Sequence, residues 1–350
     1  MQLPDSLAER LLGWYAAGHR ALPWRQDHEP YHVWLSEIML QQTRVEAVKG
    51  YYARFLSELP DIAALAACEE NRLTKLWEGL GYYSRVRNLQ KAARVIMVQH
   101  GGAFPRKYAE IRALPGVGDY TAGAVASICF DVPEPAVDGN VLRVLSRVTQ
   151  DTAPVTRPAV KKAYETALRP VYAANPGKRS ELTQALMELG ACVCVPNGAP
   201  KCDACPLRTV CLAEKERRVG FAPPSRRQKS PAASKKRRSS FFNAAGSTPC
   251  ASGPRRVCFA GLWELPNVEG TLDAQQALAL LDSWGLVPEE LTRTRERTHI
   301  FTHVEWRMRC YDIRVSMPAD SFTWVSGTRF QQDIALPTAF RIFWQPEDAE

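Results

Sequence analysis

The sequence predicts two domains of different fold class, an all-α domain followed by a smaller α+β domain, joined by a basic linker. The chain has 350 residues, which is too long for one ordinary hydrophobic core. Up to about residue 216, apolar residues recur at three- and four-residue spacing, with Gly and Pro between the runs, as in amphipathic helices. In the C-terminal part the period changes, because Val304, Trp306, Met308 and Cys310 alternate with charged residues as in a half-buried strand.

The boundaries follow from these patterns: a helical domain over 1–216, a flexible linker over 217–240 and an α+β domain over 241–346. The strongest helical periods lie at 4–18, 31–56 and 70–100. In the second domain, "TLDAQQALALLDSWG" predicts a helix and "RRVCFAGLWELP" predicts a strand. The first strands after the linker, near "SSFFNAAGSTPCASG", look shortened and rich in small residues.

Charge is concentrated in the linker. Eleven Lys and Arg and no Asp or Glu lie from Arg217 to Arg256, so the rest of a chain with net charge +8 sums to −3. The segment "PPSRRQKSPAASKKRRSS" is typical of a solvated tether, and its cations also suit contact with DNA phosphates. "SKKRR" is open to a second interpretation, as a nuclear targeting signal.

The bulk composition places the protein inside the cell. No apolar run is long enough to span a bilayer, and the N-terminus lacks the pattern of a secretory signal. We therefore expect a cytoplasmic bacterial protein with no membrane partner. Five of the ten cysteines crowd between Cys192 and Cys211, which favours metal binding over disulfides.

The stretch "LPGVGDYTAGAV" places Gly116 and Gly118 at the start of a predicted helix near Tyr120. Glycine permits close approach to the main chain, and the free N–H groups of a helix N-terminus favour an anion such as phosphate. The stretch lacks the Lys-Ser/Thr of a Walker loop. A phosphate seat and a plain interhelical turn remain equal alternatives on this stretch alone.

The cysteine loop has the spacing C-x7-C-x2-C-x5-C through Cys194, Cys202, Cys205 and Cys211, with Cys192 left over. Four thiolates in one loop suit either an iron–sulfur cluster or structural zinc. Zinc ribbons usually carry two C-x2-C pairs, and only one is present here, which favours iron and sulfur.

Two carboxylates lie in apolar surroundings. Glu37 in "HVWLSEIML" shares a helix face with apolar residues, and desolvation there raises a carboxyl pKa as a general acid requires. Asp138 in "EPAVDGNVLRVL" is by itself better interpreted as a helix cap. Taken together with the glycine stretch and the cysteine loop, the pair suits cleavage of a glycosidic bond, in which one carboxyl group protonates the leaving group and the other stabilises an oxocarbenium ion.

The first domain resembles the helix-hairpin-helix DNA glycosylases, and within them the MutY-type adenine DNA glycosylases. The resemblance rests on motifs in a consistent order through the whole domain, together with the cysteine loop. These motifs are "PWR" (23–25), "SEIMLQQT" (36–43), "GLGYYSRVRNL" (79–89), "LPGVGDYTAGAV" (114–125), "VDGNVLRV" (137–144) and "QALMELGA" (184–191). The first cysteine gap is x7 where the family usually has x6, so Cys194 is favoured as a ligand and Cys192 is the alternative.

The resemblance implies a monomer that acts on the bacterial nucleoid and excises adenine mispaired with 8-oxoguanine or guanine in double-stranded DNA, and it implies one 4Fe-4S cluster. Glu37 corresponds to the acid that protonates adenine at N7, and Asp138 to the carboxylate that stabilises the sugar cation, assisted by Tyr120 and Asn140. The adenine pocket is implied at Trp24, Arg25, Leu40 and Gln184. DNA contacts are implied at Gln41, Gln42, Thr43, Tyr82, Leu114, Gly116, Val117 and Gly118, with Gln41 and Tyr82 as wedges in the base stack and Thr43 at the opposing 8-oxoguanine.

Position 120 separates two activities within the superfamily. Endonuclease III has a lysine there, which attacks the sugar and cleaves the strand, whereas this chain has Tyr120. The expectation is therefore a monofunctional glycosylase that leaves an abasic site. A lyase for oxidised pyrimidines and an iron–sulfur DNA-binding protein without catalysis are the alternatives.

The second domain is similar to the family's MutT-like module, through "FAGLWELP" (259–266) and "THIFTHVEW" (298–306). Phe301, Thr302 and His303 match the loop that inspects 8-oxoguanine, with Thr in place of Ser. The predicted helix lacks the clustered glutamates that hold magnesium in Nudix hydrolases. We therefore expect recognition and no nucleotide hydrolysis.

Overall fold

A computed structural model of the chain describes residues 2–219, 235–244, 248–252, 262–301, 304–316, 320, 322–325, 329 and 332–343. The chain divides into two compact units, residues 1–67 with 87–229 and residues 68–86 with 230–350. In the described ranges, none of the helices combines the length and the hydropathy that crossing a lipid bilayer requires.

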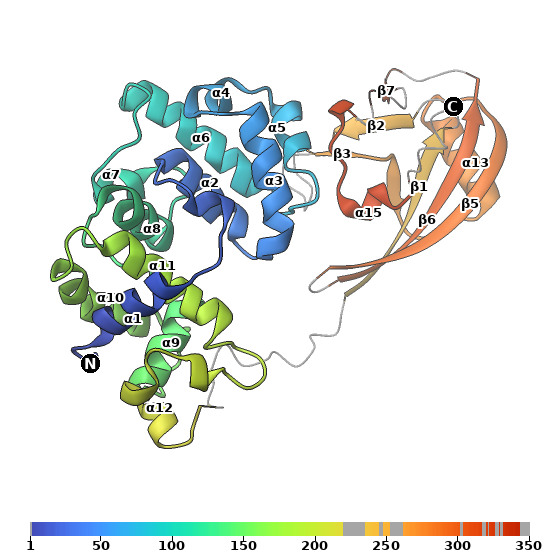
Figure 1. Ribbon diagram of the computed structural model, residues 1–350. Helices are drawn as coiled ribbons and strands as arrows, with labels where there is room; N and C mark the ends of the chain where they lie inside the picture. The colour runs from blue at the N-terminus through green and yellow to red at the C-terminus, as the bar shows by residue number, and fades with distance from the viewer. Residues whose placement is uncertain are drawn as a thin grey trace. The chain divides into compact units, whose positions relative to one another are not determined.

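The first unit is built of helices wherever it is described, which confirms the predicted all-α domain (Figure 1). Two predicted helical runs, over 31–56 and 70–100, are each interrupted by a short turn. The apolar pattern continues across each turn, so the pattern alone does not reveal it. The run over 31–56 breaks after Leu40, where Gln42 has a φ of +59°. The elements are α1 (Leu7–Ala17), η1 (Pro23–Arg25), α2 (Pro30–Leu40), α3 (Val45–Glu58), α4 (Ile62–Ala67), most of α6 (Ser84–Gln99), α7 (Tyr108–Ala113), α8 (Asp119–Phe130), α9 (Gly139–Thr149), α10 (Pro158–Ala173), α11 (Arg179–Cys192), η2 (Cys202–Ala204), η3 (Arg208–Val210) and α12 (Leu212–Lys215).

One hydrophobic cluster of this unit joins α1, α9, α10 and α11, through residues such as Leu11, Leu145, Leu168 and Leu189, all fully buried. Helix α8 is buried along most of its length, from Thr121 to Ile128. Its small side chains allow close packing against α2 and α11. This packing places the N-terminus of α8 beside the middle of α2.

The second unit contains a four-stranded mixed sheet of order β4-β1-β6-β5 and a three-stranded sheet of order β3-β2-β7, which confirms the α+β class. Strand β1 is parallel to β6 and antiparallel to β4, and β5 is antiparallel to β6. The elements are α5 (Glu70–Leu76), β1 (Lys235–Ala244), β2 (Thr248–Ser252), β3 (Trp263–Glu264), β4 (Asn267–Glu269), α13 (Ala274–Ser283), β5 (Pro288–Phe301), β6 (Val304–Val315), β7 (Thr323–Val325) and α15 (Thr338–Arg341).

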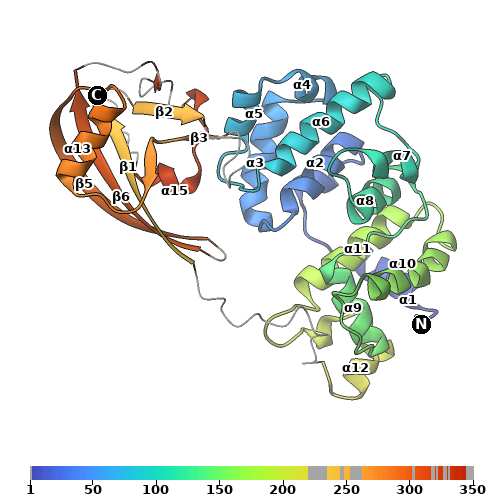
Figure 2. The same cartoon turned by 180° about the vertical axis from the view of Figure 1, so that it is seen from behind.

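Adjacent residues of β1 serve opposite faces of the larger sheet, as the alternation of a strand requires. Phe242 packs in the cluster that contains α13, and Phe241 packs with Trp306 and with Phe340 of α15. Figures 1 and 2 show α13 and α15 on opposite sides of this sheet. Helix α13 begins where predicted, because Asp273 forms a capping box with Gln276.

The structure corrects two expectations around β1. The strand begins at Lys235, so residues 235–240 are not linker, and with ten residues it is not shortened. Its serines are buried polar residues with partners: Ser239 Oγ accepts a hydrogen bond from Trp306 Nε1 at 3.0 Å, and Ser240 Oγ accepts one from Leu272 N at 3.0 Å. Small polar residues in a sequence resemble linker unless these partners are known.

The strand expected over 255–266 is described only in its last part, where Trp263 and Glu264 form β3. Residues 253–261 lie outside the described residues, and so does most of the basic segment, over 220–234.

Candidate active site

A cavity of about 580 Å³ opens in the first unit, between α2, the N-termini of α8 and α9, helix α11 and the short η1. The structure brings every proposed catalytic and adenine-pocket residue of this unit to its wall. The lining includes Trp24, Arg25, Glu37, Leu40, Gln41, Gln42, Thr43, Tyr120, Asp138, Asn140 and Gln184.

Glu37 is the buried acid of this cavity, with only 7% of its surface exposed. Burial raises the pKa of its carboxyl to about 7, and the nearby charge of Asp138 acts in the same direction. A hydrogen bond with Tyr120 and the charge of Arg25 oppose this rise without cancelling it. A large fraction of Glu37 is therefore protonated at neutral pH, as a general acid must be.

Tyr120 lies in the first turn of α8 and forms a hydrogen bond with the Glu37 carboxyl. Its hydroxyl also lies 3.9 Å from Met187 Sδ. Burial, followed by the charges of Glu37 and Asp138, raises the pKa of the Tyr120 phenol well above its usual value. The phenol therefore stays neutral at physiological pH, which favours a hydrogen-bonding role over a nucleophilic one.

Asp138 is the N-cap of α9, so the cap interpretation is correct and does not compete with a role in the cavity. Its Oδ1 accepts a hydrogen bond from Val141 N at 2.8 Å, and its Oδ2 accepts one from Asn140 Nδ2 at 2.8 Å. These bonds fix the carboxylate at the helix N-terminus, where the helix dipole favours a negative charge.

Arg143 is a supporting residue that the sequence reasoning missed. Its guanidinium donates to Asn140 Oδ1, to Gly190 O and to Cys194 O, each at 2.8 Å. A Cβ on Gly190 would lie 2.7 Å from Asn140 Cβ, so this glycine lets α9 and α11 approach. Arg143 thus connects the amide that orients Asp138 to the cysteine loop. The i+3 spacing from Asn140 was visible in the sequence, but its partners about fifty residues away were not.

Glu188 on α11 was also missed, because in sequence it resembles any charged helix residue. It is 2% exposed and pairs with Arg20 at 2.7 Å and with Arg25 at 2.9 Å. Burial alone would raise the pKa of Glu188, but the two arginines together lower it to about 2. Glu188 therefore remains ionised and holds Arg25 in the cavity wall.

The amide of Gln184, on the same wall, is fixed by two neighbours. Its Oε1 accepts a hydrogen bond from Tyr15 at 3.1 Å, and its Nε2 donates to Ser180 Oγ at 3.1 Å. These two hydrogen bonds fix which side of the amide carries the oxygen and which carries the nitrogen. The orientation of Gln184 in the cavity wall is therefore defined.

The hairpin between α7 and α8 presents its main chain, since the side chains of Leu114 and Val117 are buried. Gly116 has a φ of +77°, and a Cβ there would lie 2.6 Å from Asn88 Cβ, so glycine is required. Gly118 has an extended conformation and caps α8, and nothing lies within 4 Å of the position of its missing Cβ. The free helix N-terminus and the open Gly118 suit close approach of a phosphate.

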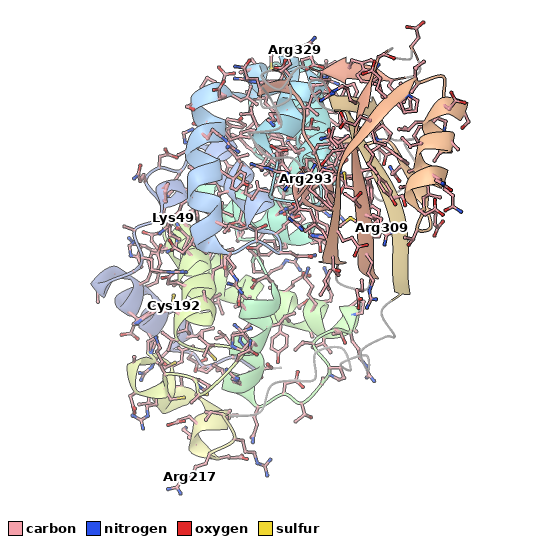
Figure 3. All side chains as sticks on the ribbon, turned by 90° about the vertical axis from the view of Figure 1, so that its right-hand side faces the viewer. Lys49, Cys192, Arg217, Arg293, Arg309 and Arg329 are labelled. Atoms are coloured by element: carbon pink, nitrogen blue, oxygen red, sulfur yellow. The ribbon has the colours of Figure 1, made fainter. Side chains whose placement is uncertain are left out.

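Four thiols of the cysteine loop line one cavity: Cys194, Cys202, Cys205 and Cys211. Buried Arg147 adds a positive charge there and donates to Cys194 Sγ at 3.2 Å. Cys192, at the C-terminal end of α11 (Figure 3), does not line this cavity, and its Sγ donates to Glu188 Oε1 at 3.5 Å. Across the described ranges, no three His, Cys, Asp or Glu side chains are grouped to hold a single metal ion.

In the second unit, Tyr82 is exposed to 57% and has a φ of +48°, a conformation that non-glycine residues rarely adopt. Thr302 and His303 lie outside the described residues, as does the side chain of Phe301. These three remain a prediction.

A helical fold with a buried glutamate on α2, a glycine-containing hairpin before α8 and an aspartate at the N-cap of α9 is the arrangement of a DNA glycosylase of the helix-hairpin-helix class. The model of the HhH-GPD superfamily of base excision DNA repair proteins matches residues 35–170, and a NUDIX domain model matches residues 248–345. Adenine DNA glycosylases of rat and mouse are each 34% identical, over 91% and 95% of this chain and 72% and 77% of their own. The chain belongs to the adenine DNA glycosylase family.

The structural comparison agrees with this assignment. The structure of a thermostable thymine-DNA glycosylase matches 61% of this chain and 96% of its own, with a TM-score of 0.54 and 26% identity.

Proposed function

We propose that the protein hydrolyses the N-glycosidic bond of adenine that is mispaired with 8-oxoguanine or guanine in double-stranded DNA, and leaves an abasic site. The observation that carries the proposal is the buried acid Glu37, with a pKa of about 7, in one cavity with the capped carboxylate Asp138. Membership of the adenine DNA glycosylase family identifies adenine as the base that is removed.

Glu37 transfers its proton to N7 of adenine, which makes the base a better leaving group. The bond between N9 and C1′ of the sugar then breaks, and its electron pair leaves with the base. Asp138 stabilises the positive charge on the sugar, and Asn140 holds that carboxylate in place. Water adds to C1′ and gives up a proton to the ionised Glu37, which restores the acid for the next turnover.

Strand cleavage through an enzyme amine requires a nucleophilic nitrogen at the sugar. The described residues that line the cavity include no lysine, and position 120 is occupied by a neutral phenol. Both features support hydrolysis over lyase chemistry, so the product is an intact strand with an abasic site.

The DNA contacts are proposed on four groups of residues. The hairpin with Gly116 and Gly118 offers main-chain N–H groups to the backbone, and Gln41, Gln42 and Thr43 border the mouth of the cavity. Removal of a base from a duplex requires that its nucleotide be turned out of the stack, and Tyr82 is the proposed wedge. Phe301, Thr302 and His303 are proposed to contact the opposing 8-oxoguanine.

The four thiols of the cysteine cavity are proposed to hold one 4Fe-4S cluster. The donor set fits, since four sulfur ligands face one space that has an arginine at its edge. A cluster held by these four thiolates would give the loop a rigid frame. The hydrogen bond from Arg143 to Cys194 O then supports Asn140 and, through it, Asp138.

Replacement of Cys194 by serine should lower the iron and sulfide bound per protein and broaden or lower the thermal unfolding transition. Cys192→Ser is the matched control, because Cys192 lies two residues away and outside the cavity. Iron, acid-labile sulfide and visible absorbance measure the cluster. Equal loss in both variants, or loss only in Cys192→Ser, would contradict the assignment of Cys194.

The substrate is tested by single-turnover base release from duplexes that carry A opposite 8-oxoguanine, A opposite G, or thymine glycol opposite A. We expect adenine release from the first two, faster opposite 8-oxoguanine, and none from the third. Release of thymine glycol in preference to adenine would refute the proposed substrate.

A further inference from the structure

The turn that carries Tyr82 is held in an unusual conformation from inside the second unit. Gly79, Gly81 and Tyr82 have φ values of +100°, +70° and +48°. Trp77 Nε1 donates to Gly81 O at 3.1 Å, and Arg85 Nη2 donates to Leu80 O at 3.0 Å and to Gly81 O at 3.2 Å. The Arg85 guanidinium also lies 5.6 Å from the centre of the Tyr82 ring. The turn therefore has a fixed shape that holds Tyr82 in the solvent.

Glu78, directly before this turn, attaches it to the C-terminal segment of the same unit. Its side chain is 10% exposed, and Oε1 accepts a hydrogen bond from Leu336 N at 3.0 Å. Oε2 lies 3.0 Å from Lys75 Nζ and 3.7 Å from Arg341 Nη1. Lys75 Nζ also donates to Ile334 O at 2.8 Å. One buried carboxylate thus joins a backbone amide and two cations at the base of the turn.

The C-terminal segment is in turn part of the sheet's core. Leu336 and Phe340 are buried in one cluster with Trp306 of β6, and the rings of Trp306 and Phe340 have centroids 5.7 Å apart. Strand β6 begins at Val304, immediately after the proposed 8-oxoguanine loop. A continuous series of packed groups therefore leads from the start of β6 through Trp306, Phe340 and Leu336 to Glu78.

We propose that Glu78 is a positioning residue that couples recognition of the base opposite adenine to the placement of Tyr82. This inference rests on the proposed function. A hydrogen bond to an ionised acceptor is stronger than one to a neutral acceptor, so replacement of Glu78 by glutamine weakens the bond from the buried Leu336 N and removes the charge that faces Lys75 and Arg341. The turn then loses its attachment to the segment that packs under β6, while Tyr82 keeps its own contacts with Arg85.

The test uses the full-length protein and compares Glu78→Gln with Glu70→Gln, the same substitution at an exposed position of α5. Single-turnover rates of adenine release are measured opposite 8-oxoguanine and opposite guanine. We expect Glu78→Gln to reduce the ratio of the two rates by about tenfold, within the usual range of coupling between sites, and to leave the rate opposite guanine unchanged. Glu70→Gln should match the wild type.

A second measurement follows the insertion of Tyr82 into the base stack. Fluorescence of 2-aminopurine placed beside 8-oxoguanine increases when the stack is opened, and this increase should be smaller for Glu78→Gln than for the wild type. Lys75→Met removes the donor to Ile334 O and should change both measurements in the same direction. This variant replaces Glu78→Gln in the test if Glu78→Gln fails to fold.

An unchanged rate ratio in stable Glu78→Gln and Lys75→Met, or an equal fall of both rates, would overturn the coupling alone. A wild-type protein that releases adenine opposite neither base would overturn the proposed function, and the coupling with it. Equal wild-type rates opposite the two bases would overturn the coupling and leave the proposed substrate standing. The wild-type rates therefore separate the two failures.

Discussion

Glu37→Gln should reduce the single-turnover rate of adenine release by about 10² to 10⁴, the usual contribution of general acid catalysis. The substitution keeps the shape of the side chain and a group for Tyr120 to contact, but it removes the transferable proton. Binding should be retained, because Glu37 lies inside the cavity and the proposed backbone contacts lie on other residues. Base release and affinity for a duplex with a cleavage-resistant adenosine, fluorinated at C2′, measure the two effects separately.

Glu46→Gln, on the exposed face of α3, is the matched control and should retain wild-type activity. The pH profile gives an independent check on the same residue. Because the pKa of Glu37 lies at about 7, its proton is present below that pH and lost above it, so wild-type release should slow as the pH rises past 7. Full activity of Glu37→Gln would exclude the carboxyl as the acid.

Asp138→Asn should reduce the rate by about 10² to 10³, in the range measured when one group that stabilises transition-state charge is removed. Asparagine is as good an N-cap as aspartate, so α9 should begin at the same residue and the free energy of unfolding should change little. The negative charge beside the sugar is what the variant loses. Single-turnover release together with thermal unfolding measures these two quantities.

Asp273→Asn, at the N-cap of α13, is the corresponding substitution far from the cavity in sequence and should leave the rate unchanged. A large loss of stability in Asp138→Asn with little loss of rate per folded molecule would assign Asp138 to capping alone.

The main features of the fold were predictable because they depend on local patterns. Helical periods identified α1 and α8, the alternation from Val304 to Cys310 identified β6, and α13 was correctly placed. The turn at 41–44 was not predicted, since apolar periodicity continues across it, and the helical run expected over 70–100 likewise continued across the turn at 77–83. Strand β1 was misread because Ser239 and Ser240 are buried against partners far away in the sequence.

The site was predictable where a motif carries the chemistry and hidden where a role depends on long-range contacts. Glu37 and Asp138 were recognisable as a pair, whereas their closeness to Tyr120 emerges only from the packing of α2 against α8. Glu188 and Arg143 belong to no motif that states their role. Each acts through partners on elements that are remote in sequence. The apolar period of a helix does not indicate these partners, so the roles could not be predicted.

The most direct measurement of the central claim is the strand integrity of the DNA after one turnover on A opposite 8-oxoguanine, analysed with and without alkali. The proposed chemistry of Glu37, Asp138 and Tyr120 predicts free adenine and a strand that breaks only after alkali. Breakage without alkali, or no adenine released by protein with its cluster intact, would contradict a monofunctional adenine glycosylase.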